Sequence, residues 1–500
     1  MKNKPNKLKY KQLGISTQKD NVVYLRQDSD VCISEGFEAL TRVRVSTANT
    51  SIVADLNVVT SDILGLDEIG LSNKAADKLN LEDGDLLKVT HLEPIESLMH
   101  LRAKIYNQEL DYEAYQSIIT DIIKGEYSNI QVAAFVIACA GNRMSIHEIS
   151  NLTKAMTCSG VQLKWNSEMV MDKHCIGGLP GNRTTPIVVS IVSAFGLTMP
   201  KTSSRAITSS AGTVDTMEVI TNVSLSPEQI KNVVEKDGGC FVWGDAARLS
   251  PADDILIRVE KALDIDSEGQ LIASVLSKKA AAGSTHVVID MPVGETAKVR
   301  NMETARLLSS HIETVGQEIG LQMKVIITDG CQPVGNGIGP VLEAVDILKI
   351  LRGEPEAAKD LKERAILIAG QLIELSGKVK LGEGSSIALE ILDSGKAYQK
   401  FKAICLSQGR FTEPVLAKFS HEVYSEAEGT LIRIDNRKIA KLAKLSGAPE
   451  FNGAGILLNV HVGNTITKGQ LLFTIYSGAE GELKYALGYL KKHTDILTIL

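Results

Sequence analysis

The first part of the chain, residues 1–95, alternates short apolar runs with polar turns. Four runs, 22–25, 42–45, 51–54 and 86–89, combine β-branched and large apolar residues, a composition typical of strands. Strands this short and this closely spaced predict a small β-rich domain, and a barrel is the arrangement we expect.

Residues 96–165 change to the period of an α-helix. The run 111–124 is amphipathic at helical spacing, and Ser145 with Glu148 forms the capping-box signature of another helix start. The pattern predicts a helical-bundle domain, to which we assign residues 250–282 as a second, inserted helical stretch. One helix has an apolar face that either packs inside this domain or forms a homodimer contact. Its members are Ala133, Val136, Ile137 and Ala140.

Strand and helix patterns alternate from residue 166 onward. A short strand is expected at 168–171, and the runs 286–290 and 324–329 are almost continuously apolar, as in strands buried on both faces. The alternation predicts an α/β domain, residues 166–249 plus 283–414, with a central, mostly parallel sheet. A ligand of such a sheet is expected at the carboxyl ends of its strands.

The last part, residues 415–500, returns to short strands and tight turns. It resembles the hammerhead-like lobe of lipoyl or biotinyl carriers, but the Met beside the modified lysine of such carriers is absent. Carrier function is therefore not expected. The predicted fold class is a multidomain α/β protein with a β-rich N-terminal domain, a helical bundle, an α/β domain and this C-terminal α+β lobe.

Composition limits the classes of function. The net charge of −6 provides no general attraction for nucleic acid, and seven scattered cysteines without a CxxC pair indicate reduced thiols and a cytoplasmic protein. No apolar run has transmembrane length, and no apolar segment follows the basic N-terminus, so we expect neither membrane insertion nor a signal peptide. The basic N-terminus itself is expected to be a frayed, solvated start.

Two loops rich in Gly, Ser and Thr carry the candidate chemistry. The first, residues 172–185, contains Lys173 and His174, and the second, residues 201–218, contains Arg205. Glycine lets main-chain N–H groups approach an anion, and hydroxyls with a fixed cation complete an oxyanion site. We interpret the two loops as walls of one phosphate site.

Other interpretations of the first loop fit less well. A P-loop requires Gly-Lys-Ser/Thr where residues 182–184 are Asn-Arg-Thr, and the glycines are not spaced as in the dinucleotide fingerprint. His174 and Cys175 are adjacent, and no second cluster at ligand spacing accompanies them, so we expect no bound metal.

These loops and one further motif resemble the thymidine and pyrimidine-nucleoside phosphorylase family. The second loop contains Ser-x-Arg followed by Gly-Thr-x-Asp-x-x-Glu, the first contains Lys-His-x-x-Gly-Gly, and residues 272–279 resemble the base-binding helix. The resemblance covers about residues 97–490. The N-terminal extension, with 180–182 and 265–270, resembles the longer subfamily that includes archaeal AMP phosphorylases. The motif residues of the two loops are Lys173, His174, Gly177, Gly178, Ser203, Arg205, Gly212, Thr213, Asp215 and Glu218.

The resemblance implies reversible phosphorolysis of an N-glycosidic bond, in which inorganic phosphate is a co-substrate and neither a cofactor nor a metal takes part. The implied catalytic residues are His174, Arg258, Asp266 and Lys278. The implied phosphate ligands are Lys173, Cys175, Thr185, Ser203 and Thr213. Cys175 stands where the short enzymes carry Ser, and a thiol is a weak donor. The implied nucleoside- or nucleotide-binding residues are Gly178, Ser204, Arg205, Ala206, Ile207, Thr208, Ser209, Ser274 and Lys298.

The leading substrate implied is a pyrimidine nucleoside, with thymidine and phosphate giving thymine and 2-deoxyribose 1-phosphate. A nucleoside 5′-monophosphate (AMP, CMP or UMP) giving ribose 1,5-bisphosphate stays open, and there Asp266 would donate a proton to the base. More distant alternatives are a phosphoribosyltransferase and a non-catalytic nucleotide sensor. We expect a small-molecule substrate, no nucleic-acid polymer, and a homodimer or higher homo-oligomer formed through the helical domain.

Overall fold

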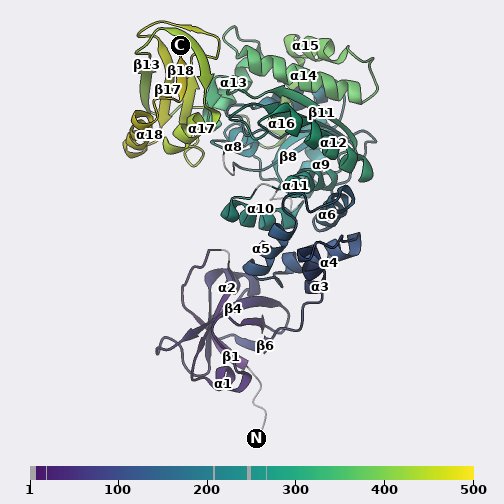
Figure 1. Cartoon of the computed structure of the whole chain (residues 1–500), viewed down its shortest axis with the longest axis vertical. Coiled ribbons are helices and arrows are strands. Elements are labelled where there is room, and N and C mark those ends of the chain that lie inside the picture. The colour runs from purple at the N-terminus through teal and green to yellow at the C-terminus, as the bar shows by residue number, and fades with distance from the viewer. Residues whose placement is uncertain (1–6, 19, 207–208, 245–248, 266) are drawn as a thin grey trace. The chain divides into compact units, whose positions relative to one another are not determined.

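The computed structural model describes residues 7–18, 20–206, 209–244, 249–265 and 267–500. The chain forms two compact units (Figure 1). One contains Met1–Gln108 and Ser117–Ala138, and the other contains Glu109–Gln116 and Cys139–Leu500. This grouping differs from the four predicted domains, whose boundaries stay a prediction.

The first unit contains a closed barrel of six strands. These are β1 (Lys7–Gln12), β2 (Val22–Arg26), β3 (Arg42–Ser46), β4 (Ser51–Val59), β5 (Glu68–Leu71) and β6 (Leu86–His91). Their order around the barrel is β1-β5-β2-β4-β3-β6, and β1 also pairs with β6. Side chains alternate along β3, where Val43 and Val45 are fully buried and Arg44 points outward to Glu126, with Nη2 2.8 Å from Oε1. The four β-prone runs of the sequence therefore correspond to β2, β3, β4 and β6.

The expectation of a frayed start covered residues 1–9 and is wrong for residues 7–9, which lie in β1, while residues 1–6 lie outside the described residues. Leu8 and Tyr10 are buried inside the barrel, while Lys7 and Lys9 are exposed. The lysines that suggested a solvated tail are the outward positions of an alternating strand.

Helices complete the first unit. Helix α1 is capped by Ser29, whose hydroxyl accepts from the N–H of Cys32, and it ends at Gly36 with φ of 65°. The helices are α1 (Asp30–Glu35), α2 (Asn73–Leu79), α3 (Leu98–Ile105) and α5 (Asn129–Ala138), and α4 (Tyr112–Lys124) belongs to both units.

The second unit is organised around parallel strands. Strands β7 (Met171–Cys175), β10 (His286–Val293) and β11 (Gln322–Asp329) form a parallel sheet in the order β11-β10-β7. Strands β8 (Met199–Ser203) and β9 (Gly239–Trp243) form a parallel pair, and a parallel bridge between Val170 and Thr198 joins the two groups. The carboxyl ends of β7 and β8 therefore lie at the same edge. The predicted strand at 168–171 is displaced to β7, which places Lys173 and His174 in the strand rather than in the loop after it.

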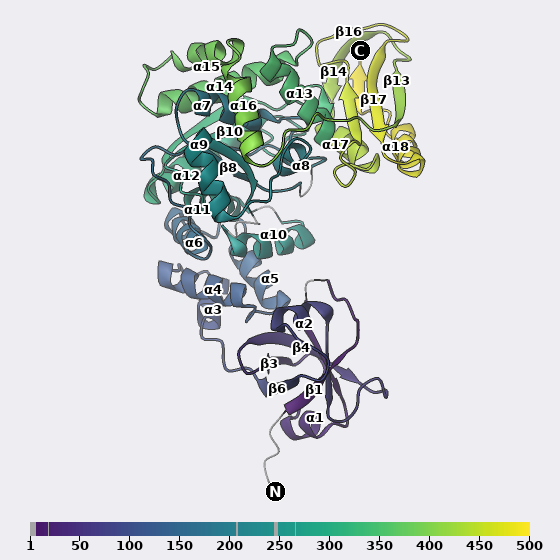
Figure 2. The ribbon, with the colours of Figure 1, turned by 180° about the vertical axis from the view of Figure 1, so that it is seen from behind.

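Helices pack on both faces of these strands. The helices α7 (Thr184–Ala194), α14 (Lys359–Leu375), α15 (Gly384–Asp393) and α16 (Lys396–Ser407) lie side by side (Figure 2) and share one apolar core. A second core joins α6 (Ile146–Cys158), α11 (Glu268–Ala281), α12 (Met302–Glu318) and β10. The capping box predicted for α6 is confirmed. The remaining helices of this α/β part are α8 (Thr213–Glu218), α9 (Pro227–Asp237), α10 (Pro251–Leu263) and α13 (Pro340–Arg352).

The C-terminal lobe is tied to the α/β part by strand pairing. A two-residue strand, β12 (Gly337–Ile338), pairs antiparallel with β15 (Gly455–Leu458) of the lobe. The approach is so close that a Cβ at Gly455 would lie 2.1 Å from the carbonyl oxygen of Ile338. The segment that carries β12 also reaches the first loop, since the N–H of Val334 donates to Pro180 O at 3.1 Å. The other elements of the lobe are β13 (Phe419–Tyr424), β14 (Gly429–Ile434), α17 (Asn436–Leu445), β16 (Thr465–Ile466), β17 (Leu471–Ser477), α18 (Glu480–Lys492) and β18 (Leu497–Ile499).

Within the described residues, no helix combines the length and the apolar character that crossing a membrane requires.

Candidate active site

A buried carboxylate flanked by two lysines lies beneath the edge where β7 and β8 end. Asp172 is fully buried, and its Oδ1 accepts from Lys201 Nζ at 2.8 Å while its Oδ2 accepts from Lys279 Nζ at 2.7 Å. Burial alone would raise the pKa of Asp172, but the two ammonium groups hold it below its ordinary value. Burial also lowers the pKa of Lys279, although Asp172 acts against this shift. Strands β7 and β8 and helix α11 thus meet at one charge cluster.

His174 follows directly on β7 and is half-buried. Removal from water lowers its pKa well below the ordinary value, and the charges of Lys279, Lys201, Lys278 and Lys173 lower it further. The imidazole is therefore neutral near pH 7. A neutral imidazole has one N–H donor and one acceptor, so it can share a hydrogen bond with a base or a sugar without adding charge.

This neutral state predicts a dependence of stability on pH. Because folding holds the pKa of His174 below about 6.5, the unfolded chain binds more protons once the pH falls below that value. We expect the His174 contribution to the free energy of unfolding to be complete above about pH 6.5 and to be lost progressively below it. Urea unfolding on both sides of this pH should therefore show a weaker decline for His174→Gln than for the wild type. Identical slopes would contradict the prediction.

The first loop follows β7 and ends at the start of α7, and Lys173 in the strand reaches that helix start. Lys173 is buried, and its Nζ donates to Thr184 Oγ1 at 2.7 Å. Burial lowers the pKa of Lys173, and neighbouring Asp290 partly offsets this. Burial raises the pKa of Cys175, whose sulfur accepts from Asn182 Nδ2 at 3.2 Å, so this thiol stays protonated. Thr185 is also buried, one residue after the hydroxyl that Lys173 holds.

The second loop is held by a carboxylate that accepts main-chain N–H groups. Asp215 Oδ2 accepts from the N–H of Ala206 at 2.7 Å and from that of Gly212 at 2.8 Å. A Cβ at Gly212 would lie 2.6 Å from the nitrogen of Ala206, so the loop closes only around glycine at this position. The two loops meet where Arg183 Nη1 donates to Thr213 Oγ1 at 3.2 Å.

Arg205 is occupied within the second loop. Its Nη1 and Nη2 donate to the two carboxylate oxygens of Glu218 at 2.6 and 2.8 Å, and Nη1 also donates to Asp215 at 3.2 Å. Hydrogen bonding to Glu218 raises the pKa of Arg205. Its guanidinium carbon lies 4.9 Å from the centre of the Trp243 ring. Two carboxylates neutralise the guanidinium of Arg205. Arg205 therefore stabilises the conformation of the second loop rather than offering a free positive charge to an anion.

Lys278 and Ser274 lie one turn apart on α11, and Asp253 of α10 holds the lysine. Lys278 Nζ donates to Asp253 Oδ2 at 2.7 Å and to Ser274 Oγ at 3.3 Å. Lys278 is also close enough to lower the pKa of His174. The predicted base-binding pair and the histidine at the end of β7 thus belong to one neighbourhood. Arg258, also on α10, is exposed.

The other predicted residues occupy the same loops. Ser203 ends β8 and is half-buried, Ser204 is exposed, and Ser209 Oγ donates to Ala211 O at 2.9 Å. Gly178 is exposed with φ of 65°, and the N–H of the exposed Lys298 donates to the preceding Gly177 O at 3.1 Å. Ile207, Thr208 and Asp266 lie outside the described residues.

Sequence reasoning assigned no role to Asp172, Lys201 or Lys279. The sequence signal that could have found them is a charged residue inside an otherwise apolar strand or helix. Such a residue is rarely buried unless a partner of opposite charge accompanies it, so it indicates a buried ion pair. The same signal marks Asp290 on β10, which is fully buried and whose Oδ1 accepts from Thr328 Oγ1 at 2.6 Å.

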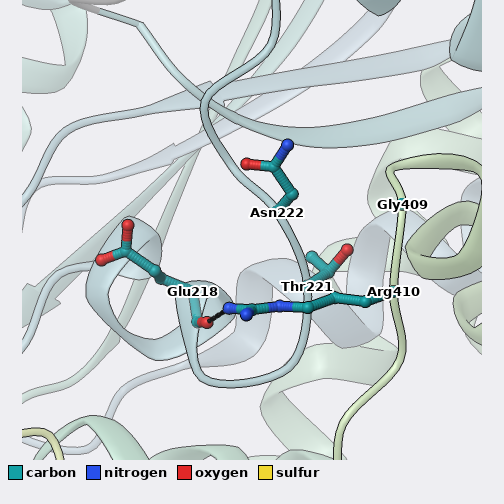
Figure 3. A pocket seen from close by; sticks show the side chains of 5 residues that line it. All are labelled: Glu218, Thr221, Asn222, Gly409 and Arg410. Atoms are coloured by element: carbon teal, nitrogen blue, oxygen red, sulfur yellow. Dashed lines mark hydrogen bonds between the residues drawn. The ribbon is translucent and has the colours of Figure 1, made fainter.

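A small polar hollow of about 250 Å³ lies beyond the end of α8. Figure 3 shows Arg410 reaching the main-chain carbonyl of Glu218, a hydrogen bond of 2.6 Å. Of the motif residues of the two loops, Glu218 lines it, but the carboxylate of Glu218 is bonded to Arg205 and the predicted phosphate and base ligands lie elsewhere, so we do not place the active site there. Its lining residues are Glu218, Thr221, Asn222, Gly409 and Arg410.

Comparison with known proteins agrees with this arrangement. Residues 167–398 match the model "Glycosyl transferase family, a/b domain", and residues 99–160 match "Glycosyl transferase family, helical bundle domain". A protein of Legionella pneumophila (strain Corby) named "Putative thymidine phosphorylase" is 54% identical over 492 residues, covering 98% of this chain and 95% of that protein. A Polaromonas protein of the same name is 51% identical over 496 residues, covering 99% and 97%.

A solved structure shows the same fold at lower similarity. Anthranilate phosphoribosyltransferase from Thermus thermophilus superposes with a TM-score of 0.53 and 20% identity, covering 62% of this chain and 99% of that one. The family matches and the relatives define the class of the protein as a pentosyltransferase. Within that class, the chain belongs to the thymidine phosphorylase-like family.

Proposed function

We propose that the protein catalyses reversible phosphorolysis of a pyrimidine nucleoside, with thymidine as the leading substrate and inorganic phosphate as co-substrate. The observation that carries the proposal is the meeting of the two loops at the ends of β7 and β8. There Lys173 holds Thr184, Arg183 holds Thr213, and His174 lies within the electrostatic range of Lys278. The relatives named for thymidine phosphorylase support the choice of substrate.

The chemistry follows from this arrangement. Phosphate on the loops would attack C1′ of the sugar as the bond to the base breaks, through a transition state with oxocarbenium character. Holding phosphate and C1′ in line lowers the barrier by orientation, and a fixed cation stabilises negative charge on the departing base. Lys278, held by Asp253, is the cation assigned to the base. Neutral His174 would complete the hydrogen bonds to the base or sugar.

A nucleoside 5′-monophosphate is the second candidate substrate. The observation in its favour is the position of Lys298, whose main-chain N–H donates a hydrogen bond to the carbonyl oxygen of Gly177 in the first loop. A cation at this place could face a 5′-phosphate. In that reaction Asp266 would protonate the base.

We expect turnover to require phosphate and to be unaffected by removal of divalent metals. Hydroxyls and ammonium groups line the proposed phosphate site, and the described residues contain no cluster of three His, Cys, Asp or Glu side chains suited to a metal. The measurement is release of base from thymidine, uridine, cytidine, AMP, CMP and UMP, with and without phosphate, then with a chelator. Loss of activity with the chelator would instead favour a phosphoribosyltransferase. Release from nucleotides alone would replace thymidine by the second candidate.

We also propose that the protein is a cytoplasmic homodimer or higher homo-oligomer. The members of the apolar face predicted on and after α5 differ in burial. Val136 is fully buried, while Ile137 is 45% exposed. Ile130, about two turns before Ile137 on the same helix, is 82% exposed. Ile130 and Ile137 are therefore the residues we assign to the contact between subunits, and light scattering of Ile130→Glu against the wild type tests it.

A further inference from the structure

Arg183, the residue immediately before α7, connects three separate segments. Its Nε donates to Glu343 Oε2 on α13 at 2.7 Å, its Nη1 to Thr213 Oγ1 at 3.2 Å, and its Nη2 to Ala211 O at 2.8 Å. Only 13% of the side chain is exposed. One guanidinium thus links the end of the first loop to the second loop and to α13.

Glu343 is a fixed anchor for this guanidinium. Its side chain is 1% exposed, its Oε2 also accepts from Thr216 Oγ1 at 2.9 Å, and its Oε1 accepts from the N–H of Gly339 at 3.4 Å. A planar guanidinium can contact three acceptors in fixed directions, which a lysine ammonium on a flexible stem does not reproduce. Arg183 therefore has a defined position before any ligand binds.

The contact with Thr213 sets the direction of that hydroxyl group. A threonine hydroxyl has one proton and two lone pairs. Because Arg183 donates to the oxygen, its proton points elsewhere and is available to donate. The hydroxyl oxygen of Thr184 likewise accepts a hydrogen bond from a cation, since Lys173 Nζ donates to it at 2.7 Å. Thr184 is fully buried, whereas Thr213 is partly exposed. The second loop thus presents a hydroxyl that a largely buried cation has turned into a donor, which suits an anion with acceptor oxygens.

We propose that Arg183 is a positioning residue for phosphate, which joins the two loops and directs the hydroxyl proton of Thr213 toward the anion. The inference rests on the proposed phosphorolysis and adds to it a residue that acts through Thr213. Arg183 itself has its three donor groups directed at Glu343, Thr213 and Ala211.

The test compares Arg183→Met and Arg183→Lys with the wild type. Losing one hydrogen bond to a charged group corresponds to about a tenfold effect, so we expect both variants to raise the KM for phosphate about tenfold and to leave the KM for the nucleoside nearly unchanged. Arg183→Lys keeps a positive charge beside Glu343 and guards against loss of folding. Arg352→Met is the matched control. Arg352 is the last residue of α13, the helix that carries Glu343, and it pairs with Glu413 at the protein surface. Equal changes in both KM values would overturn the proposal.

A double-mutant cycle separates positioning from a structural role. If Arg183 acts through Thr213, Arg183→Met should have little further effect on the KM for phosphate in a Thr213→Val background. Additive effects of the two substitutions would overturn the proposal.

Phosphate binding measured without turnover distinguishes this inference from the proposed function. Inorganic phosphate should raise the Tm of the wild type and raise that of Arg183→Met much less. This difference would support the positioning role even if no nucleoside were cleaved. A wild type whose Tm does not respond to phosphate, or a variant that responds equally, would overturn it.

Discussion

Asp172→Asn is expected to lower the free energy of unfolding by about 3–5 kcal/mol, the typical effect of removing one partner of a buried ion pair. The carboxylate of Asp172 is fully buried and is bonded to the ammonium groups of both Lys201 and Lys279. An amide keeps the shape but removes the charge, and its N–H₂ would face one of the two ammonium groups. Two buried cations would then remain without a counter-charge. The measurement is urea-induced unfolding followed by circular dichroism.

Asp393→Asn is the control for this prediction. Asp393 pairs with Lys362 at 2.9 Å in the same unit, but its side chain is 55% exposed. Exposed pairs contribute about 1 kcal/mol or less, so the control should unfold almost as the wild type does. If Asp172→Asn and Asp393→Asn lower the free energy of unfolding equally, the buried cluster would not be the stabilising element that its geometry indicates.

Lys173→Met is expected to raise the KM for phosphate roughly 10- to 100-fold, since a charge-assisted hydrogen bond contributes about 1.5–3 kcal/mol. The loss has two sources. The positive charge disappears from the end of β7, and Thr184 loses the donor 2.7 Å away that orients its hydroxyl. The KM for the nucleoside should change much less, because Ser274 and Lys278 lie on a separate element, helix α11. Initial rates over both substrate concentrations give the two values.

Lys231→Met provides the comparison for Lys173→Met. Lys231 lies on α9, is 52% exposed and pairs loosely with Glu235 at 3.8 Å. Its removal should alter neither KM. An equal rise in both KM values for Lys173→Met would mean that Lys173 supports the fold of the strand end rather than the anion.

The elements of the fold follow closely from local pattern. Alternating or continuous apolar runs marked β2, β3, β10 and β11, and the capping box of Ser145 and Glu148 marked the start of α6. Strand β1 was missed because its lysines form the outward half of the alternation, which is also the composition of a solvated tail. The extent of β7 was misplaced because its polar residues are paired with partners distant in sequence, such as Lys201.

The candidate site could be predicted only in part, because only some of its signals are local in the sequence. Glycine and hydroxyl residues in both loops are local signals, and the structure brings these loops together through Arg183 and Thr213. The occupation of Arg205 by Glu218 could not be predicted, because a cation beside an acid fits equally well a ligand for an anion or a loop closure. The anchor at Glu343 lies 160 residues from Arg183 and has no local signature.

The pairing of β12 with β15 has a consequence for the order in which the protein matures on the ribosome. Ile338 pairs with Ile456, more than a hundred residues later in synthesis, and the segment that carries β12 also contacts Pro180 in the first loop. Contacts between residues so distant in sequence form late, because the chain between them must first be made and closed into a loop. The nascent α/β part therefore lacks the strand partner of the segment that contacts the first loop until the C-terminal lobe has been translated. This pairing therefore forms at the end of translation, when nearly the whole chain is available to fold.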